Sequence, residues 1–449
     1  GVTVKDPYRW LEDEKAPDVV QWMQDQDALA RAELGKLPER DALAGRLREI
    51  LYTDSVSAPH KRKNRYFYSR RHADKEKGIV YVKDGKAGKE RVLFDPNAWS
   101  EKENIALGVW APSHDGKKVA YATRKNNSDE ATLYVIDVET MKVSDVDVIE
   151  GAKYAYPSWT PKGDGFYYTW LPTDKSIKPA DRPGFAEVRF HRLGQPAAKD
   201  ELVRERTGDS TKFISADLSK DGRFLFLSID HGWSGNELYF KDLEREPKAG
   251  QKHEFVPLAL GAKAHYRAAA HRGQIFVMTD EDAPNWKIVR VDPRAPEKAK
   301  WETIVPESKD RAMDNFGVVG DRLVIAYLEK ASSRLELRST DGKQSTPVAL
   351  PSLGSISSIV GQPDDPEAYF AFESFTTPVE IHELEVKTGK TKLHARPKVP
   401  VDGSKFETEQ VTYKSKDGTP VTMFIVRPKG APKDGSGRVY LYGYGGFQV

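Results

Sequence analysis

The spacing of apolar residues in the first fifty positions predicts two amphipathic helices. Pro17 suits a first helical position, and apolar side chains follow it at helical intervals, at Val19, Trp22, Met23, Leu29, Ala30 and Leu34. After Pro38 a second set repeats the i, i+4, i+7, i+8 pattern, at Leu43, Leu47, Ile50 and Leu51. Two such helices cannot bury their apolar faces alone, so we expect them to dock on another domain.

From Tyr52 onward the pattern changes to short runs of aromatic and β-branched residues separated by Asp-Gly, Asn-Arg and Lys-Gly turns. Seven such runs recur about fifty residues apart, at positions 65–69, 118–122, 165–169, 223–228, 274–278, 322–327 and 368–372. Each of these runs is followed by a second short apolar run and, in most cases, by a third, and together they form one repeating unit. This repeat predicts a seven-bladed β-propeller over residues 53–400, one blade per unit. Two stacked β-sandwiches are the alternative, but they require no sevenfold repeat.

The pattern of apolar and polar residues changes again near residue 401. Residues 409–413 and 422–426 flank Ser-Lys-Asp-Gly at 415–418, which is a hairpin signature. A polar loop at 429–437 leads to an expected buried strand at 439–442, which would need neighbours on both sides. We therefore expect residues 401–449 to open a truncated α/β domain. The helical segment 1–52 would pack on this domain, with the propeller inserted between them in the sequence. We also expect the chain to be part of a longer polypeptide.

Composition and charge exclude several classes of protein. The chain has 449 residues, and 70 Lys and Arg against 68 Asp and Glu leave a net charge of +2. This balance argues against nucleic-acid binding, which needs a surplus or a stripe of cations. No apolar run approaches the roughly 18 residues of a membrane span. The chain has no cysteine, so disulfides and thiolate chemistry are excluded. The cytoplasm and the periplasm both remain open as compartments.

Self-sufficient catalytic motifs are missing from the sequence, which has no G-x-S-x-G elbow, Walker loop, H-E-x-x-H or G-x-G-x-x-G turn. The ten histidines are scattered, and even the two closest, His265 and His271, lack metal-ligand spacing. We expect neither a metal site nor a cofactor. Trp170 and Trp233 could touch a ligand, although aromatic packing between blades explains them equally well.

The informative stretch is Leu-Tyr-Gly-Tyr-Gly-Gly-Phe at 441–447. Glycines directly after a strand let the backbone approach a ligand closely, and a tyrosine hydroxyl held by such a turn can donate a hydrogen bond to an oxyanion. This singles out Tyr444. An ordinary glycine turn with aromatic packing is the alternative.

Several motifs together resemble the prolyl oligopeptidase family of serine peptidases. They are Asp-Pro-Tyr-Arg-Trp-Leu-Glu-Asp at 6–13, Leu-Phe-Asp-Pro at 93–96, Ser-Phe-Thr-Thr-Pro at 374–378, Lys-Asp-Gly-Thr at 416–419, Met-Phe-Ile-Val at 423–426 and the stretch 441–447. With the seven repeats, the resemblance covers essentially the whole chain. The last motif favours the proline-specific branch over oligopeptidases that cut after basic residues.

The resemblance implies a monomeric serine endopeptidase that cleaves short peptides on the carboxyl side of internal prolines. In that family a seven-bladed propeller caps an α/β-hydrolase domain and restricts access to the active site between them. Tyr444 matches the oxyanion-hole tyrosine, and Phe447 matches an aromatic residue that lines the pocket for the proline ring. Large folded proteins, nucleic acids and membranes are not expected as partners.

The sequence departs from the family pattern at two positions and in one larger respect. Gln448 stands where asparagine is common, and Thr422 replaces a proline. The family's nucleophilic serine, aspartate and histidine lie downstream of this motif, outside these residues. Two alternatives therefore remain: an oligopeptidase that cuts after basic residues, and a non-catalytic propeller that binds peptides.

Overall fold

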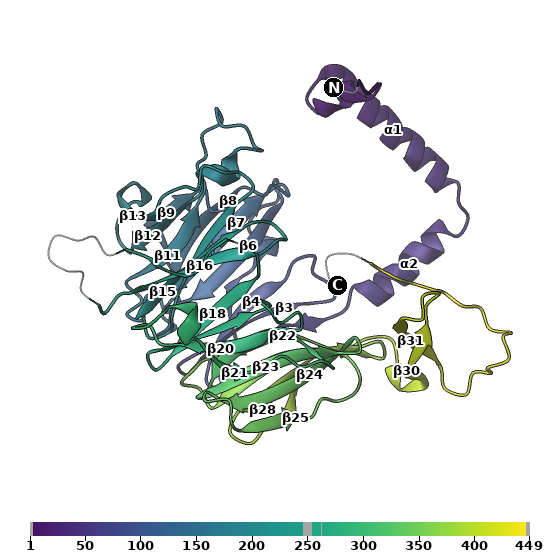
Figure 1. Cartoon of the computed structure of the whole chain (residues 1–449). Helices are drawn as coiled ribbons and strands as arrows, with labels where there is room; N and C mark the ends of the chain where they lie inside the picture. Colours follow the sequence, from purple (N-terminus) through teal and green to yellow (C-terminus); the bar gives the residue numbers. More distant parts are fainter. Residues whose placement is uncertain (1–2, 246–253, 262, 446–449) are drawn as a thin grey trace. The chain divides into compact units, whose positions relative to one another are not determined.

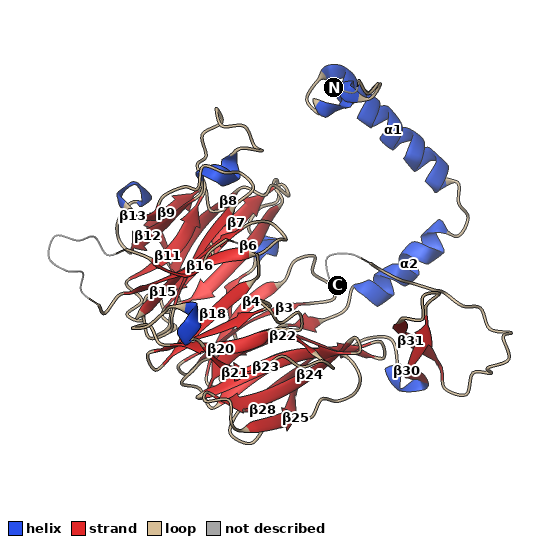
Figure 2. Cartoon of the chain, in the orientation of Figure 1, coloured by secondary structure: helices blue, strands red, loops and turns tan. Residues whose placement is uncertain are grey.

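The computed structural model describes residues 3–245, 254–261 and 263–445, and the chain divides into two compact units. The first carries the N-terminal helices up to Thr53, together with Val399–Val401. The second holds Asp54–Lys398 and the segment that starts at Asp402. Figure 1 colours both units along the sequence, and Figure 2 shows that helices dominate the first and strands the second.

The two predicted helices are confirmed as α1 (Pro17–Gly35) and α2 (Arg40–Leu51), preceded by a short 3₁₀ turn at Arg9–Glu12. Pro17 occupies the first turn of α1, where its missing N–H leaves no hydrogen bond unmade. Val19 is the one buried residue of α1 within the described structure. The apolar side chains of Leu43 and Leu47 on α2 are exposed. Their docking partner remains a prediction.

The predicted propeller is confirmed by seven antiparallel sheets within the described part of the second unit, and the stacked sandwiches are excluded. Blades 1 to 3 consist of β1 (Ser55–Val56), β2 (His60–Arg62), β3 (Arg65–Arg71), β4 (Ile79–Asp84) and β5 (Arg91–Phe94); β6 (Ile105–Pro112), β7 (Lys118–Lys125), β8 (Ala131–Asp137) and β9 (Val143–Glu150); and β10 (Ser158–Trp159), β11 (Gly165–Trp170), β12 (Glu187–Arg192) and β13 (Glu201–Arg204).

Blades 4 and 5 consist of β14 (Phe213–Leu218), β15 (Phe224–Asp230), β16 (Asn236–Asp242) and β17 (Val256–Ala259); and β18 (Tyr266–His271), β19 (Gln274–Thr279), β20 (Lys287–Val291) and β21 (Glu302–Val305). Blades 6 and 7 consist of β22 (Ala312–Val319), β23 (Arg322–Glu329), β24 (Ser332–Ser339) and β25 (Ser345–Val348); and β26 (Ser355–Gly361), β27 (Glu367–Ser374), β28 (Thr377–Glu385) and β29 (Lys390–Ala395).

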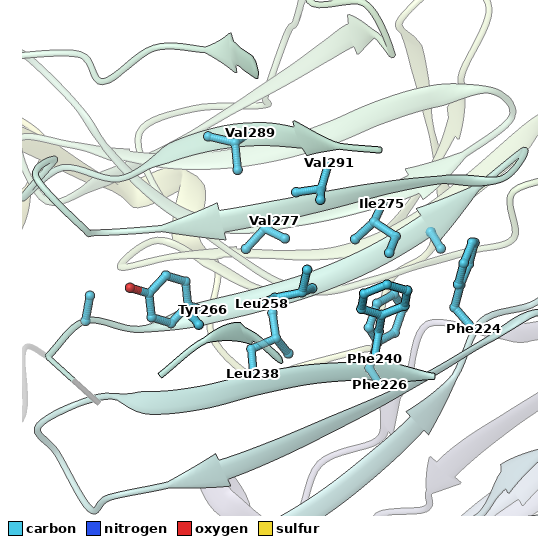
Figure 3. Packing of buried hydrophobic residues seen from close by; sticks show 13 residues of the cluster. Phe224, Phe226, Leu238, Phe240, Leu258, Tyr266, Ile275, Val277, Val289 and Val291 are labelled. Atoms are coloured by element: carbon cyan, nitrogen blue, oxygen red, sulfur yellow. The ribbon is translucent and has the colours of Figure 1, made fainter. Parts of the chain in front are cut away.

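The hydrophobic core lies between the blades rather than inside any one of them. In the described structure a cluster of buried side chains fills each of the seven interfaces. Figure 3 shows the cluster between blades 4 and 5, where Phe224, Phe226 and Phe240 face Ile275 and Val277. Each fully buried side chain of this size contributes about 1.5–3 kcal/mol, so the blades stabilise one another in sequence around the ring.

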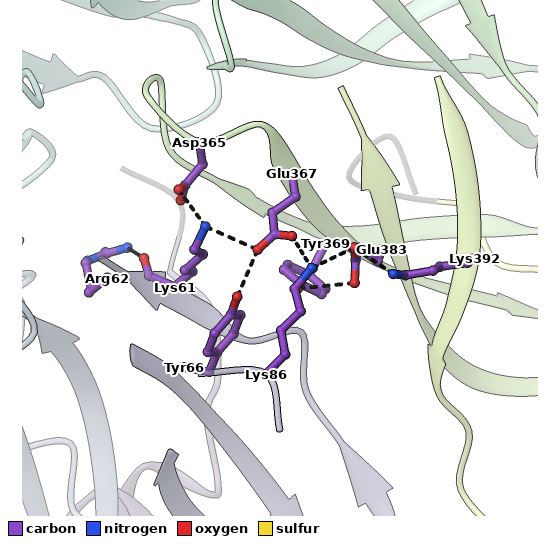
Figure 4. Close-up of polar contacts among 9 residues, drawn as sticks. All are labelled: Lys61, Arg62, Tyr66, Lys86, Asp365, Glu367, Tyr369, Glu383 and Lys392. Atoms are coloured by element: carbon purple, nitrogen blue, oxygen red, sulfur yellow. Dashed lines mark hydrogen bonds and ion pairs between the residues drawn. The ribbon is translucent and has the colours of Figure 1, made fainter. Parts of the chain in front are cut away.

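Blade 1 and blade 7 meet where the ring closes, and their interface is more polar than the one in Figure 3. Five buried residues form its hydrophobic cluster: Ala58, Tyr66, Tyr369, Ala371 and Ile381. Beside them Lys61 and Lys86 of blade 1 bind Glu367 of blade 7 (Figure 4), and the Tyr66 hydroxyl donates to the same carboxylate at 3.0 Å. We call this set of contacts the closing seam. Ion pairs there join two blades that no strand crosses.

The predicted hairpin after the propeller is also confirmed. β30 (Phe406–Lys414) pairs with β31 (Pro420–Pro428), and Lys414 lies opposite Pro420. Gly418 closes the turn at φ +84°, a conformation that glycine adopts without steric cost. Its N–H donates to the Ser415 carbonyl at 2.9 Å. The hairpin contacts blade 7 through Phe424 and Phe375, whose ring centroids are 5.3 Å apart.

Candidate functional site

The meander topology of the blades gives the propeller two unlike faces. On one face the second strand of each blade turns into the third, and the chain passes from blade to blade; we call this the connection face. The chain enters the ring at Ser55 and leaves it after Ala395 on that face. On the opposite face the first strand of each blade turns into the second, as at Lys63–Asn64 in blade 1. Residues far apart in sequence can meet on either face.

The predicted oxyanion donor, Tyr444, lies in the extended segment after β31. Its side chain is 56% exposed, and its hydroxyl has no hydrogen-bond partner among the described residues. The strand expected at 439–442 is wrong, because Val439, Tyr440 and Tyr442 are exposed and in irregular backbone. A strand forms only where its N–H and C=O groups find partners, and the described chain offers this segment none. Phe447 and Gln448 lie outside the described residues.

The two tryptophans singled out from the sequence have different surroundings. Trp170, at the end of β11, donates from Nε1 to the Glu150 carbonyl at 3.1 Å. The Arg189 guanidinium lies 3.7 Å from its ring centroid, which is a close cation–π contact. Packing therefore explains Trp170. Trp233 lies in the turn after β15 and is 78% exposed, so it remains a candidate for contact with a ligand.

A polar cluster that the sequence did not reveal contains Asp230, which lies three residues before Trp233 in the chain. His265 donates from its backbone N–H to Asp280 at 2.7 Å, and its Nδ1 lies 2.8 Å from the other oxygen of that carboxylate. Burial raises the pKa of Asp230, at the end of β15, above its usual range, although Ser228, His265 and His231 act in the opposite direction. A carboxyl of this kind can accept or donate a hydrogen bond. Asp230, His265 and Asp280 all lie at strand ends on the connection face.

Two cavities also belong to the connection face. One, of about 270 Å³, lies between blades 6 and 7 and the hairpin, where Phe375 and Phe424 form part of its wall. The other, of about 160 Å³, lies between blades 2 and 3 and is lined by small apolar side chains together with Arg124, Lys153 and Tyr156. A third cavity, lined by Arg223, Arg272 and Arg290 among others, has its arginines engaged by carboxylates.

The opposite face carries a group of cationic and imidazole side chains from three blades. Burial and the positive charges of Arg62 and Lys220 lower the pKa of His60 to about 4, and the same causes lower the pKa of His114 to about 4. Lys220 keeps contact with solvent, yet the loss of hydration and the charge of Arg62 lower its pKa to about 8. The charges of Asp217 and Asp364 oppose these effects on the pKa of Lys220. The charges of Arg62 and Lys220, rather than the two histidines, give this group its positive character.

His191 resembles a catalytic histidine in its partners but not in its access. Its Nδ1 lies 2.7 Å from Asp200 and its Nε2 3.0 Å from Asp147. The Tyr168 hydroxyl donates to the second Asp200 oxygen at 2.6 Å. Because His191 is fully buried between blades 2 and 3, no substrate can reach it. The group joins strands rather than performing chemistry.

The remaining histidines bind separate partners. His265 contacts Asp280, whereas His271 lies 2.5 Å from Asp321 on the opposite face. No group of three or more His, Asp or Glu side chains in the described ranges is arranged to hold a metal ion. Within the same ranges, no helix has both the length and the apolar character that crossing a membrane requires.

Comparison with protein families finds a model that matches most of this chain. Residues 1–397 match the family model described as "Prolyl oligopeptidase, N-terminal beta-propeller domain". A curated protein named prolyl endopeptidase from Elizabethkingia meningoseptica is 32% identical over 454 residues, covering 100% of this chain and 62% of that protein. A dual function macrocyclase-peptidase from Amanita bisporigera is 28% identical, covering 100% of this chain and 64% of that protein.

Solved structures give the same result. One, from a study of two prolyl endopeptidases and the role of inter-domain dynamics in catalysis and specificity, matches with a TM-score of 0.91 and 48% identity. It covers 97% of this chain, which corresponds to 63% of that structure. Prolyl oligopeptidase B from Galerina marginata, bound to a 25mer macrocyclization substrate, matches with a TM-score of 0.85 and 25% identity over 95% of this chain and 62% of that structure. The chain thus spans less than two thirds of the length of these relatives.

Proposed function

This chain belongs to the prolyl oligopeptidase family of serine peptidases, and we propose that it supplies the N-terminal helices, the propeller and the first hydrolase strands of an endopeptidase that cleaves short peptides after internal prolines. The observation that carries this proposal is the similarity to a prolyl endopeptidase along 100% of the chain, at 32% identity. The stretch 441–447, which favours the proline-specific branch, lies within that range.

Tyr444 is the proposed donor to the oxyanion that forms when a serine attacks the carbonyl after proline. Its exposed hydroxyl, free of partners in the described structure, is compatible with this role. A donor that is already committed to an internal hydrogen bond would have to break it first. Phe447 is the proposed apolar wall for the proline ring, since an aromatic face suits a rigid apolar ring that has no donor. The serine, the aspartate and the histidine would come from outside these 449 residues.

The propeller is the proposed filter for substrates. Each of its seven interfaces is closed by buried side chains in the described structure, which supports the proposal that it excludes folded proteins while short peptides pass. The expected partners are proline-containing peptides, and the protein would act as a monomer in the cytoplasm or the periplasm.

Labelling of the natural protein with a fluorophosphonate, which reacts with activated serines, tests this proposal. Intact mass before and after treatment should show a polypeptide well above 50.5 kDa that gains a single adduct. A mass near that value without an adduct would contradict the enzymatic proposal and favour a peptide-binding propeller. Comparing the cleavage of a proline peptide with that of an arginine peptide separates the main proposal from an oligopeptidase that is specific for basic residues.

A further inference from the structure

The cavity between blades 2 and 3 has an unusual combination of walls. Its apolar lining consists of Val109 and four alanines that belong to the buried cluster of this interface: Ala122, Ala131, Ala152 and Ala155. Short side chains at these positions leave about 160 Å³ open at the edge of a packed core. An apolar cavity of about 150 Å³ accommodates a molecule the size of benzene. The space therefore admits one medium-sized side chain.

Backbone irregularity in β6 helps to form this cavity. The register between β6 and β7 shifts between Leu107 and Trp110, which is a β-bulge that contains Gly108 and Val109. A Cβ atom at Gly108 would lie 3.3 Å from Ala122 Cβ and 3.6 Å from Arg124 Nε. Glycine thus avoids a tight contact with Ala122 in the cavity wall, and the bulge places Val109 in the lining. Bulges of this kind are common beside functional sites.

Arg124, on β7 opposite Ala131 of β8, is the key polar residue of the cavity. Its Nε is buried and has no hydrogen-bond partner in the described structure. A buried donor without a partner is costly, and the cost is greater for a charged group. Glu130, directly before β8, is engaged elsewhere, since Arg182 binds both of its oxygens at 2.6 and 3.0 Å. Arg124 is therefore available to an external acceptor.

Lys153 supplies a second positive charge to the lining. Its Nζ lies 3.3 Å from Asp129, whose side chain is 73% exposed. An ion pair this exposed is weak, so a ligand can displace it. Tyr156 is 72% exposed at the rim. The described lining thus contains two cations and no acid.

We propose that this cavity binds a carboxylate carried by a peptide, with Arg124 as its main ligand and Lys153 as a second. A guanidinium matches a carboxylate with two parallel hydrogen bonds, and the alanine walls suit the methylene groups that carry it. The carboxylate can belong to a Glu side chain or to the C-terminus of the peptide. The inference rests on the proposed function in naming a peptide as ligand, and it adds a preference for acidic peptides.

The test uses the full-length natural protein and capped proline-containing heptapeptides in two matched pairs. One pair differs only in a C-terminal carboxylate or amide. The other is amidated and differs only in Glu or Gln at one internal position. Fluorescence anisotropy measures binding, and mass spectrometry measures cleavage. We expect the carboxylate form of one pair to bind about tenfold more tightly, as a charged hydrogen bond allows; the responding pair identifies the source of the carboxylate.

Arg124→Met should reduce this tenfold ratio to about one, because methionine keeps the apolar stem and removes the donor. Lys153→Gln, a second and milder variant, should reduce the ratio in part. Arg294→Met is the matched control: Arg294 is an exposed arginine outside the cavity, paired with Asp292 at 3.7 Å, and the ratio should stay near ten.

Equal binding within both peptide pairs by the wild-type protein would overturn the proposal, as would a tenfold ratio retained in Arg124→Met. Absence of cleavage by the wild-type protein, together with a retained preference for carboxylate peptides, would refute the proposed function and support the cavity assignment. Far-ultraviolet circular dichroism and thermal melting show whether each variant is folded.

Discussion

The Nζ atom of Lys61 lies 2.8 Å from Oδ1 of Asp365, and this contact joins residues that are 304 positions apart. Lys61 belongs to β2 of blade 1, and Asp365 lies two residues before the start of β27 in blade 7. Strand β2 lies beside β26, the first strand of blade 7. Most of each side chain is shielded, with 17% of Lys61 and 15% of Asp365 exposed. The ring is thus closed by charge as well as by apolar packing (Figure 4).

The closing seam should weaken in acid. Burial alone would raise the pKa of Glu367, but hydrogen bonds from Lys86, Tyr66 and Lys61 outweigh it and lower the pKa. A carboxyl with a lowered folded-state pKa stabilises the protein above its unfolded value of about 4.3, and the contribution is lost as pH falls through the folded value. Glu367→Gln should therefore reduce the free energy of unfolding at pH 7 by about 1.5–3 kcal/mol, measured by urea titration.

Glu302→Gln is the control for this prediction, because Glu302 pairs with Arg290 inside blade 5 and its side chain is 59% exposed. An exposed pair contributes about 0–1 kcal/mol. If both variants lost the same stability at pH 7, or if Glu367→Gln kept the acid sensitivity of the wild type, the seam would not depend on this carboxylate.

His191 should make the stability fall as pH rises. Burial by itself lowers the pKa of this imidazole, but the hydrogen bonds and charges of Asp200 and Asp147 outweigh it and raise the pKa. Its contribution is fully present below the unfolded value of about 6.5 and is lost as pH rises through the folded value. His191→Gln should cost about 1–3 kcal/mol at pH 5.5, and the difference from the wild type should shrink toward pH 9.

Urea titrations at both pH values measure this effect. His72→Gln serves as the control, since the His72 ring contacts the Tyr81 hydroxyl at 2.7 Å rather than a carboxylate. A constant difference between wild type and His191→Gln across this range would show that the imidazole is buried in its neutral form.

Lys220 should be among the most reactive amines of the protein. With its pKa lowered to about 8, about half of its amine is neutral at pH 8, against less than about 1% of an ordinary lysine with a pKa near 10.4. Lys61 is the contrast, because its hydrogen bonds to Asp365 and Glu367 outweigh burial and raise its pKa. Brief treatment with an acylating reagent at pH 8, followed by peptide mapping, should modify Lys220 well before Lys61. Equal rates would mean that the loss of hydration and the charge of Arg62 do not lower the pKa of Lys220.

Tyr444→Phe should separate a catalytic role from a packing role. Removing one oxyanion donor lowers kcat by about 10²–10³-fold, whereas loss of a binding contact alone raises KM. Steady-state kinetics of the full-length protein on a proline peptide measure both parameters. Tyr442→Phe, in the same exposed segment, is the control and should leave kcat within about twofold of the wild type. A Tyr444→Phe effect confined to KM would remove Tyr444 from the oxyanion hole.

Local signals in the sequence were sufficient for much of the fold. Pro17 and the helical spacing after it predict α1, and the Asp-Gly pair at 417–418 predicts the hairpin, since each depends on residues close in the chain. The propeller could be predicted because the same local pattern repeats seven times. The prediction of a strand at 439–442 was wrong because these residues have high strand propensity but find no partner strand in the described structure.

The polar sites could not be predicted, because they depend on residues brought together by the ring. His191 meets Asp147 from 44 residues away, and Lys61 meets Asp365 from the other end of the propeller. Arg124 was hidden for a different reason: its significance lies in a hydrogen bond that the described residues do not provide. Neither kind of relationship leaves a mark in the order of the residues.

The proposed proline specificity is tested by cleavage, by the full-length natural protein, of three peptides that differ only in the residue before the scissile bond. The peptides carry proline, arginine or alanine at that position, and kcat/KM is measured for each. We expect kcat/KM for the proline peptide to exceed the other two values by at least about a hundredfold, since a pocket shaped for a rigid ring excludes a long cation and leaves a methyl group loosely held. A higher value for arginine would contradict the proposed specificity.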